Sequence, residues 1–147
     1  MAYLTDKDLG WKRIVRKTNF LNGKELQAGV LWSAGTNKGV DIAYYATVNE
    51  YGTKDGRIPS RPFMALTADE QKMWESPITK AVDKILGGSE VISQLNTVGE
   101  KMVKDIKNNI GKKKYKRLAL STIARKGHDI PLIDSGALLD SIDYEVK

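Results

Sequence analysis

A long apolar stripe in the second half of the chain limits the fold more than any other feature. Between Ser89 and Ile110, hydrophobic side chains recur every three or four residues, which is the spacing of one helix face. They are Val91, Ile92, Leu95, Val98, Met102, Val103, Ile106 and Ile110. A helix over 89–110 is about 33 Å long, the width of a small domain. Its apolar face must be buried against other elements.

Shorter patterns predict the elements that cover this helix. Alternating apolar residues predict strands over 26–32 and 142–146. Helical spacing predicts further helices over 5–17, 67–86, 118–124 and 135–139. We therefore expect an α+β fold in which helices, one of them long and at about 89–110, pack on a small antiparallel sheet. The 147 residues fit one domain, 1–147, with residues 1–25 as an N-terminal helical arm.

Three other segments have informative local chemistry. Thr67 and Glu70 have the spacing of a capping box, which predicts a helix start with Thr67 at the N-cap. Ser76-Pro77 predicts either a kink or a new helix start. The prolines of 58–63 favour extended backbone. Residues 40–51 alternate as a strand does but also form a helical face, so their pattern leaves both structures open.

Few residues offer catalytic or metal-binding chemistry. The chain has no cysteine and one histidine, which excludes the usual zinc sites. His128, Asp134 and Ser135 are close in sequence, but no nucleophile elbow surrounds Ser135. The short polar residues at 134–136 instead predict a helix N-cap. No apolar run approaches the roughly 20 residues that a membrane span requires. We expect neither an enzyme nor a cofactor, and no membrane partner.

Positive charge is concentrated in one part of the chain. Lys and Arg total 24 against 18 Asp and Glu, a net charge of +6. Residues 101–126 hold ten basic side chains and one acid, so this basic segment is +9 and the remainder −3. Such a segment suits an acidic partner or a solvated surface. Since Tyr115 is its only aromatic residue, base stacking is not expected and nucleic-acid binding would be non-specific.

Three sequence blocks, taken together and in order, resemble a known family. The first is Tyr45-Ala46-Thr47-Val48-Asn49-Glu50-Tyr51-Gly52-Thr53, and the second is Ile58-Pro59-Ser60-Arg61-Pro62-Phe63-Met64. The third runs from Pro131 to Ile142 and contains Asp134-Ser135-Gly136. Their layout resembles the tail-completion, or minor tail (virion morphogenesis), family of long-tailed bacteriophages.

The resemblance implies a structural protein of the virion neck, assembled in the host cytoplasm. Copies would form a ring, hexameric by this resemblance, that completes the tail and joins it to the head connector. Neighbours would be tail-terminator, tail-tube or connector proteins, and DNA would pass through the channel without specific recognition. The resemblance also favours a helix over 40–51. The alternative function is non-specific nucleic-acid binding by residues 101–126.

The candidate interface residues come from the first two blocks and from the lysine run. Arg61 and Phe63 combine a fork-shaped donor with an apolar anchor, a pairing enriched at interface hot spots. The other interpretation is that Phe63 caps the protein's own core. We expect the basic side chains to face acidic surfaces of neighbouring subunits. The candidates are Glu50, Tyr51, Arg61, Pro62, Phe63, Lys112, Lys113, Lys114, Lys116 and Arg117.

Overall fold

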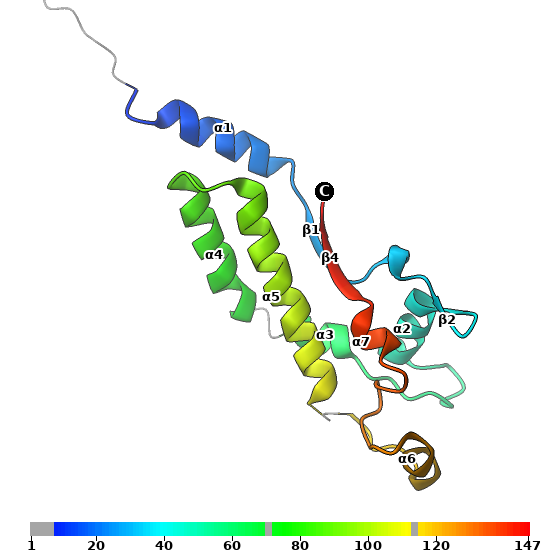
Figure 1. Cartoon of the computed structure of the whole chain (residues 1–147). Helices are drawn as coiled ribbons and strands as arrows, with labels where there is room; N and C mark the ends of the chain where they lie inside the picture. The colour runs from blue at the N-terminus through cyan, green and yellow to red at the C-terminus, as the bar shows by residue number, and fades with distance from the viewer. Residues whose placement is uncertain (1–7, 70–71, 113–114) are drawn as a thin grey trace, which may run out of the picture.

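The computed structural model describes residues 8–69, 72–112 and 115–147 and confirms the α+β class (Figure 1). The described helices are α1 (Trp11–Asn22), α2 (Ile42–Tyr51), α3 (Phe63–Asp69), α4 (Lys72–Leu86), α5 (Val91–Gly111), α6 (Leu120–Lys126) and α7 (Ala137–Asp140), with a short 3-10 helix η1 (Trp32–Ala34). The strands are β1 (Leu26–Val30), β2 (Thr36–Asn37), β3 (Val40–Asp41) and β4 (Ile142–Val146). The long helix and the C-terminal strand were both predicted from the sequence.

The main sheet pairs the segment that follows α1 with the C-terminal segment of the chain. Strand β1 pairs antiparallel with β4, with Leu26 opposite Val146 and Val30 opposite Ile142. Glu25 and Lys147 extend the ladder by exchanging two backbone hydrogen bonds of 3.1 and 2.9 Å. Because bonded and non-bonded pairs alternate in such a ladder, the backbone groups of Leu26, Ala28 and Val30 point away from β4. One edge of β1 is therefore left open by β4.

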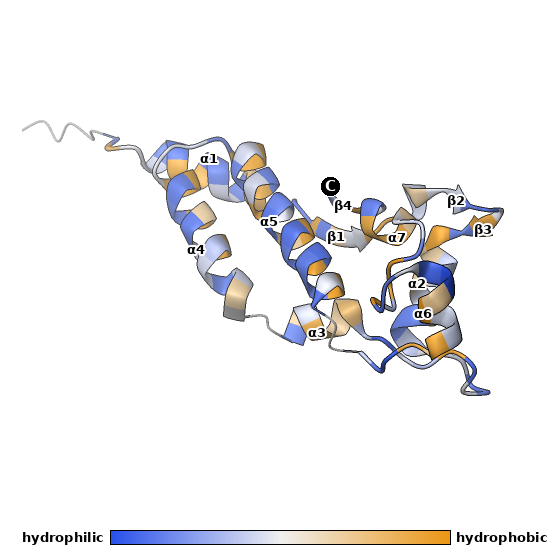
Figure 2. Cartoon of the chain, turned by 60° about the horizontal axis from the view of Figure 1, so that its bottom comes forward, coloured by the Kyte–Doolittle hydropathy of each residue, from blue (hydrophilic) through white to orange (hydrophobic). Residues whose placement is uncertain are grey.

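Helix α5 covers one face of this sheet, and α4 lies beside α5 (Figure 1). Blue and orange residues alternate along both helices in Figure 2, as expected where one helix face is buried. Gly99 of α5 lies against the ring of Tyr144 on β4, and a Cβ at this position would overlap the ring. The glycine thus permits the close approach of helix and strand.

The core forms where α2, α3, α5, α7 and β4 meet. Its buried side chains are Ala46, Phe63, Ile106, Ile110, Leu132, Leu138 and Ile142. Helix α5 contributes Ile106 and Ile110, and the other members come from segments far apart in sequence. Burying these apolar groups is the main stabilising contribution to a fold of this size.

The ambiguous segment 40–51 is mostly helical. Asp41 is the N-cap of α2, and its carboxylate accepts a hydrogen bond from the Tyr44 backbone N–H at 2.9 Å. Only Val40 and Asp41 are extended, in a hairpin with β2 whose turn places Lys38 and Gly39 at φ 52° and 81°. Side-chain capping therefore resolves what the hydrophobic pattern left open.

The first helix and the first strand differ from the predicted ranges. Helix α1 starts after Gly10, because the φ of 107° at Gly10 is not helical. The helix runs to Asn22, beyond the predicted end at Lys17. Of the predicted range, residues 5–7 lie outside the described part of the chain. Strand β1 stops at Val30, because the chain turns into η1 at Trp32.

The predicted N-cap at Thr67 is wrong. Helix α3 begins at Phe63, and Thr67 is buried inside it, donating to the Phe63 carbonyl at 2.7 Å. The Thr67 hydroxyl also accepts from Asn109 Nδ2 at 2.8 Å. The other half of the expected box, Glu70, lies outside the described residues.

The structure also decides between the alternatives at Ser76-Pro77 and places the helix start predicted at 134–136. Helix α4 runs through Pro77, so Ser76-Pro77 does not start a new helix. The N-cap of α7 is Gly136, at φ 86°, instead of the side chains before it. Ser135 accepts a 2.9 Å hydrogen bond from Asn37 Nδ2 and only a long one, 3.4 Å, from the Ala137 N–H. Ser135 therefore ties β2 to the α7 turn.

Candidate functional site

Glu50 joins the first two sequence blocks. It lies in the last turn of α2, is 7% exposed, and its carboxylate reaches the first turn of α3. Oε2 accepts from the Met64 N–H at 2.9 Å and Oε1 from the Ala65 N–H at 2.8 Å. A carboxylate at this position satisfies free helical N–H groups and complements the helix dipole. Glu50 thus caps α3, the role that the sequence had suggested for Thr67.

The segment between α2 and α3 is bonded just as closely. The Arg61 backbone N–H donates to the Asn49 carbonyl at 2.7 Å, and its guanidinium donates to Asn49 Oδ1 at 3.1 Å. The Ser60 hydroxyl donates to the Glu50 carbonyl at 2.7 Å. We call this bonded set, Asn49, Glu50, Ser60, Arg61, Met64 and Ala65, the α2–α3 junction.

Burial separates the candidates of the second block from one another. Phe63 is fully buried in the core, so of its two interpretations the core role is confirmed. Glu50 and Phe63 are almost fully enclosed by their own subunit. Arg61 and Pro62 are half-buried. Burial lowers the pKa of Arg61, and its Nε has no hydrogen-bond partner among the described residues.

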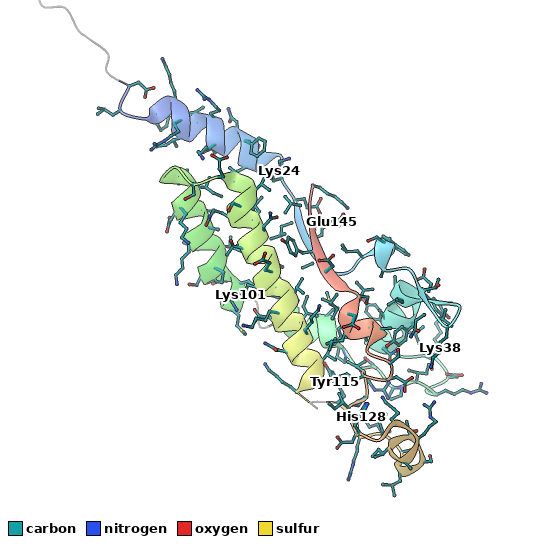
Figure 3. The ribbon with its side chains drawn as sticks, viewed as in Figure 1. Lys24, Lys38, Lys101, Tyr115, His128 and Glu145 are labelled. Atoms are coloured by element: carbon teal, nitrogen blue, oxygen red, sulfur yellow. The ribbon has the colours of Figure 1, made fainter. Side chains whose placement is uncertain are left out.

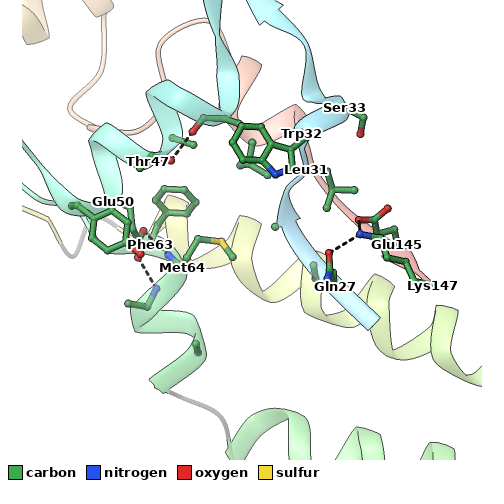
Figure 4. A pocket seen from close by; sticks show the side chains of 18 residues that line it. Gln27, Leu31, Trp32, Ser33, Thr47, Glu50, Phe63, Met64, Glu145 and Lys147 are labelled. Atoms are coloured by element: carbon green, nitrogen blue, oxygen red, sulfur yellow. Dashed lines mark hydrogen bonds and ion pairs between the residues drawn. The ribbon is translucent and has the colours of Figure 1, made fainter. Parts of the chain in front are cut away.

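A groove of about 1020 Å³ runs beside the junction (Figure 4). One side is the chain from Gln27 to Ser33, and the other is formed by α2 and α3. Seven consecutive residues line the first side, so the open edge of β1 itself faces the groove. Figure 4 shows Phe63 and Met64 on the opposite side. We call this feature the β1 groove.

Two large aromatic side chains are exposed in the lining of the β1 groove. Trp32 is 89% exposed and Tyr51 is 78% exposed. Tyr51 was a predicted interface candidate, and the structure leaves it accessible. Trp32 was missed, because its alternation with Val30 suggested an ordinary strand position. The useful signal was the Ser33-Ala34-Gly35 sequence, which predicts a loop directly after Trp32. A residue next to a loop is more often exposed than one inside a strand.

The sheet face next to the β1 groove is acidic. The ladder register places Glu25, Glu145 and Asp143 on one face together with Lys147. Lys147 Nζ lies 2.8 Å from Glu145 Oε1 and donates to Gln27 Oε1 at 3.2 Å. Interaction with Glu145, with a smaller contribution from Glu25, raises the pKa of Lys147. Three carboxylates and one amine leave this acidic face at −2; Glu145 is labelled in Figure 3.

The basic segment is divided between structural and exposed cations. Lys101 forms a 2.9 Å ion pair with Asp105, which also accepts from Trp74 Nε1 at 2.9 Å. Lys126 donates to the carbonyls of Ile130 and Pro131 at 3.0 and 3.2 Å. The predicted candidates Lys112, Lys116 and Arg117 are exposed, whereas Lys113 and Lys114 lie outside the described residues.

Tyr115 does not provide a stacking surface for bases. It is half-buried beyond the end of α5, where Figure 3 labels it, and its hydroxyl donates to the Asn109 carbonyl at 3.5 Å. Burial, and then the negative charge of Glu50, raise the pKa of Tyr115 to about 12. The side chain therefore belongs to the packing around the α2–α3 junction.

The described residues do not assemble a metal site. Over 8–69, 72–112 and 115–147, no three His, Asp or Glu side chains gather as metal ligands would. None of the helices there combines the length and the apolar character needed to cross a bilayer.

Comparison of the chain with protein-family models, with curated proteins and with solved structures found no match. A functional proposal for the chain therefore depends on its sequence blocks and on the geometry of the junction and the groove.

Proposed function

We propose that the chain is a structural virion protein of the neck of a long-tailed phage. Copies form a ring that completes the tail and joins it to the head connector. The observation that carries the proposal is that the three resembling blocks meet in one core. Ala46 comes from the first block, Phe63 from the second, and Leu132, Leu138 and Ile142 from the third. The residues that carry the resemblance therefore pack against one another in the folded chain.

Exposed apolar side chains support a role in assembly. Trp32 and Tyr51 line the β1 groove, and Trp11 is 70% exposed on α1, the helix at the other end of the molecule (Figure 1). Exposed apolar groups that gather around a groove are typical of protein–protein contact surfaces. The partners in this proposal are further copies of the chain and the adjacent tail-terminator, tail-tube or connector proteins. The proposal assigns no catalytic step and no cofactor.

A second candidate function rests on the exposed cations of the basic segment. Lys104, Lys112, Lys116, Arg117 and Arg125 are all exposed and form no ion pair among the described residues that would neutralise them. Such a set would bind nucleic acid through phosphates and without sequence preference. The half-buried Tyr115 argues against stacking on bases.

One experiment distinguishes the two functions. Virions from a lysate that produces this protein are labelled with gold-conjugated antibody against it and imaged by electron microscopy. Label at the head–tail junction is expected from the neck proposal. Virions without label there would overturn it. In parallel, binding to duplex DNA is measured over a range of salt, and tight binding that weakens steeply with salt supports the second function.

A further inference from the structure

We infer that α1 of one copy docks in the β1 groove of the next copy, in a head-to-tail contact. The inference rests on the proposed ring, because it names the surfaces through which neighbouring copies would meet. Four observations support it. Helix α1 is amphipathic and has an uncovered face, and the β1 groove is lined by apolar residues. The helix and the surroundings of the groove carry opposite charge, and the helix lies far from the groove of its own subunit.

Helix α1 is amphipathic yet buries none of its residues, all of which are described. Leu9 before it and Trp11 in its first turn are 88% and 70% exposed, and Val15 one turn later is also exposed. The helix is held to its own subunit by Lys17, which donates to the carbonyls of Gly88 and Ser89. The opposite side of its first two turns is free to contact another molecule.

The β1 groove can accept the apolar side chains of a helix. Its α2 and α3 side consists largely of small or flexible apolar residues, among them Ala43, Met64 and Ala68. Small side chains permit close approach of a helix backbone, and methionine adapts to an irregular partner. The exposed rings of Trp32 and Tyr51 lie beside these residues and would be covered by the same contact. This is the helix-in-groove mode of recognition.

The acidic face beside the β1 groove favours a basic helix such as α1 as the occupant of the groove over an acidic or neutral helix. The twelve residues of α1 include three exposed cations, Lys12, Arg13 and Arg16, and no acidic residue. The acidic face at −2 adjoins the groove and shares Gln27, Glu145 and Lys147 with its lining. Complementary charge of this kind directs docking and fixes orientation more than it adds affinity.

The contact requires two copies. Figure 1 shows α1 leading away from β1 at one end of the molecule, whereas α2 and η1, which border the groove, lie toward the other end. The same separation is visible in the rotated view of Figure 2. A contact between two different surfaces of identical chains leaves one of each surface free. It therefore propagates, and it forms a ring where the rotation between neighbours closes.

Disulfide trapping tests the contact directly, because the natural chain has no cysteine. Copies carrying Trp11→Cys are mixed with copies carrying Trp32→Cys or Tyr51→Cys and mildly oxidised. We expect a covalent dimer with at least one of the two groove cysteines. The matched control is Leu120→Cys, on α6, where the side chain is 77% exposed and outside the proposed contact. Trapping no stronger than with Leu120→Cys, for both groove positions, would overturn the inference.

Complementation tests the head-to-tail arrangement. One variant combines Trp11→Glu with Val15→Glu, and the other combines Trp32→Glu with Tyr51→Glu; all four side chains are exposed, so folding should be retained. We expect light scattering to give monomers for each variant alone and dimers for the mixture, which restores one intact contact per pair. A mixture that remains monomeric, or variants that assemble as the natural chain does, would contradict the arrangement.

The outcomes separate this inference from the proposed function. Gold label at the neck without trapping of Trp11→Cys would remove the α1 contact and retain the neck protein. Trapping without label at the neck would retain the contact and remove the phage function.

Discussion

The α2–α3 junction and the basic segment both supplied candidate residues, and the structure treats them in opposite ways. In the junction, the Glu50 carboxylate is buried and accepts two backbone N–H groups, and the adjoining Phe63 is enclosed by the core. In the basic segment, Lys112, Lys116 and Arg117 extend into solvent. Removing a junction side chain should therefore affect folding, whereas removing an exposed cation should affect association.

This difference bears on how sequence motifs are interpreted. The blocks that carry the family resemblance contain residues with several internal hydrogen bonds, such as Glu50 and Arg61. Residues of such a block can therefore serve the packing of their own chain, and they need not touch a partner. Of the exposed aromatic residues in the inferred contact, Trp11 and Trp32 lie outside the three blocks, whereas Tyr51 lies in the first. Assembly contacts can therefore differ between proteins that share such a core.

The largest effect is expected from Phe63→Ala. This side chain is fully buried, so truncation leaves a cavity and should lower the free energy of unfolding by about 3–5 kcal/mol. Urea denaturation followed by circular dichroism measures the change. The control is Tyr51→Ala, an exposed aromatic residue of the same region, for which we expect about 0.5 kcal/mol or less. Similar losses in both variants would erase the contrast between core and groove.

A smaller loss is expected from Glu50→Ala. Two N–H groups at the start of α3 lose their charged acceptor, which should cost about 2–3 kcal/mol of unfolding free energy. Glu50→Gln keeps one acceptor oxygen and should recover part of the loss. Glu100→Gln, at an exposed site on α5, serves as the control. If chemical denaturation placed Glu50→Ala within error of that control, the capping role would be wrong.

Tyr115 provides a pH test of the junction. Its pKa is about 12 in the folded chain, above the ordinary value of 10.0, so the folded state retains a proton that the unfolded state loses. The free energy of unfolding should therefore fall as the pH rises from 10 to 12. Below this window it should show no pH dependence that is due to Tyr115. Tyr115→Phe removes the group and should flatten the decline. Equal pH profiles for the two proteins would contradict a raised pKa at Tyr115.

Local patterns predicted those parts of the fold that depend on neighbouring residues. The stripe from Val91 to Ile110 marked α5, and alternation marked β4. The Thr67 prediction failed because the actual cap, Glu50, comes from another helix and lies thirteen residues before Phe63. A local sequence pattern cannot predict a capping residue that only the tertiary fold brings to the helix.

The candidate site was less predictable for the same reason. The β1 groove depends on the pairing of β1 with β4, which joins residues more than a hundred positions apart. The open edge of β1, and the exposure of Trp32 beside it, follow from that pairing and from the turn at η1. The basic segment, by contrast, was evident from composition alone, although the ion pair of Lys101 was not.

The smallest effect on folding is expected from reversing charge in the basic segment. Lys112, Lys116 and Arg117 are exposed, so changing all three to Glu should alter the free energy of unfolding by about 0.5 kcal/mol or less per site. If they face acidic surfaces of neighbouring neck proteins, the variant should join tails more slowly and with weaker salt dependence, because exposed ion pairs direct docking more than they add affinity. Lys80→Glu with Lys84→Glu, on exposed positions of α4, shows the effect of charge reversal elsewhere on the surface, with a net-charge change of −4 against −6 in the triple variant. A variant that joins tails at the normal rate but loses DNA affinity would assign these cations to phosphate contacts, and the acidic protein partner would be the wrong choice.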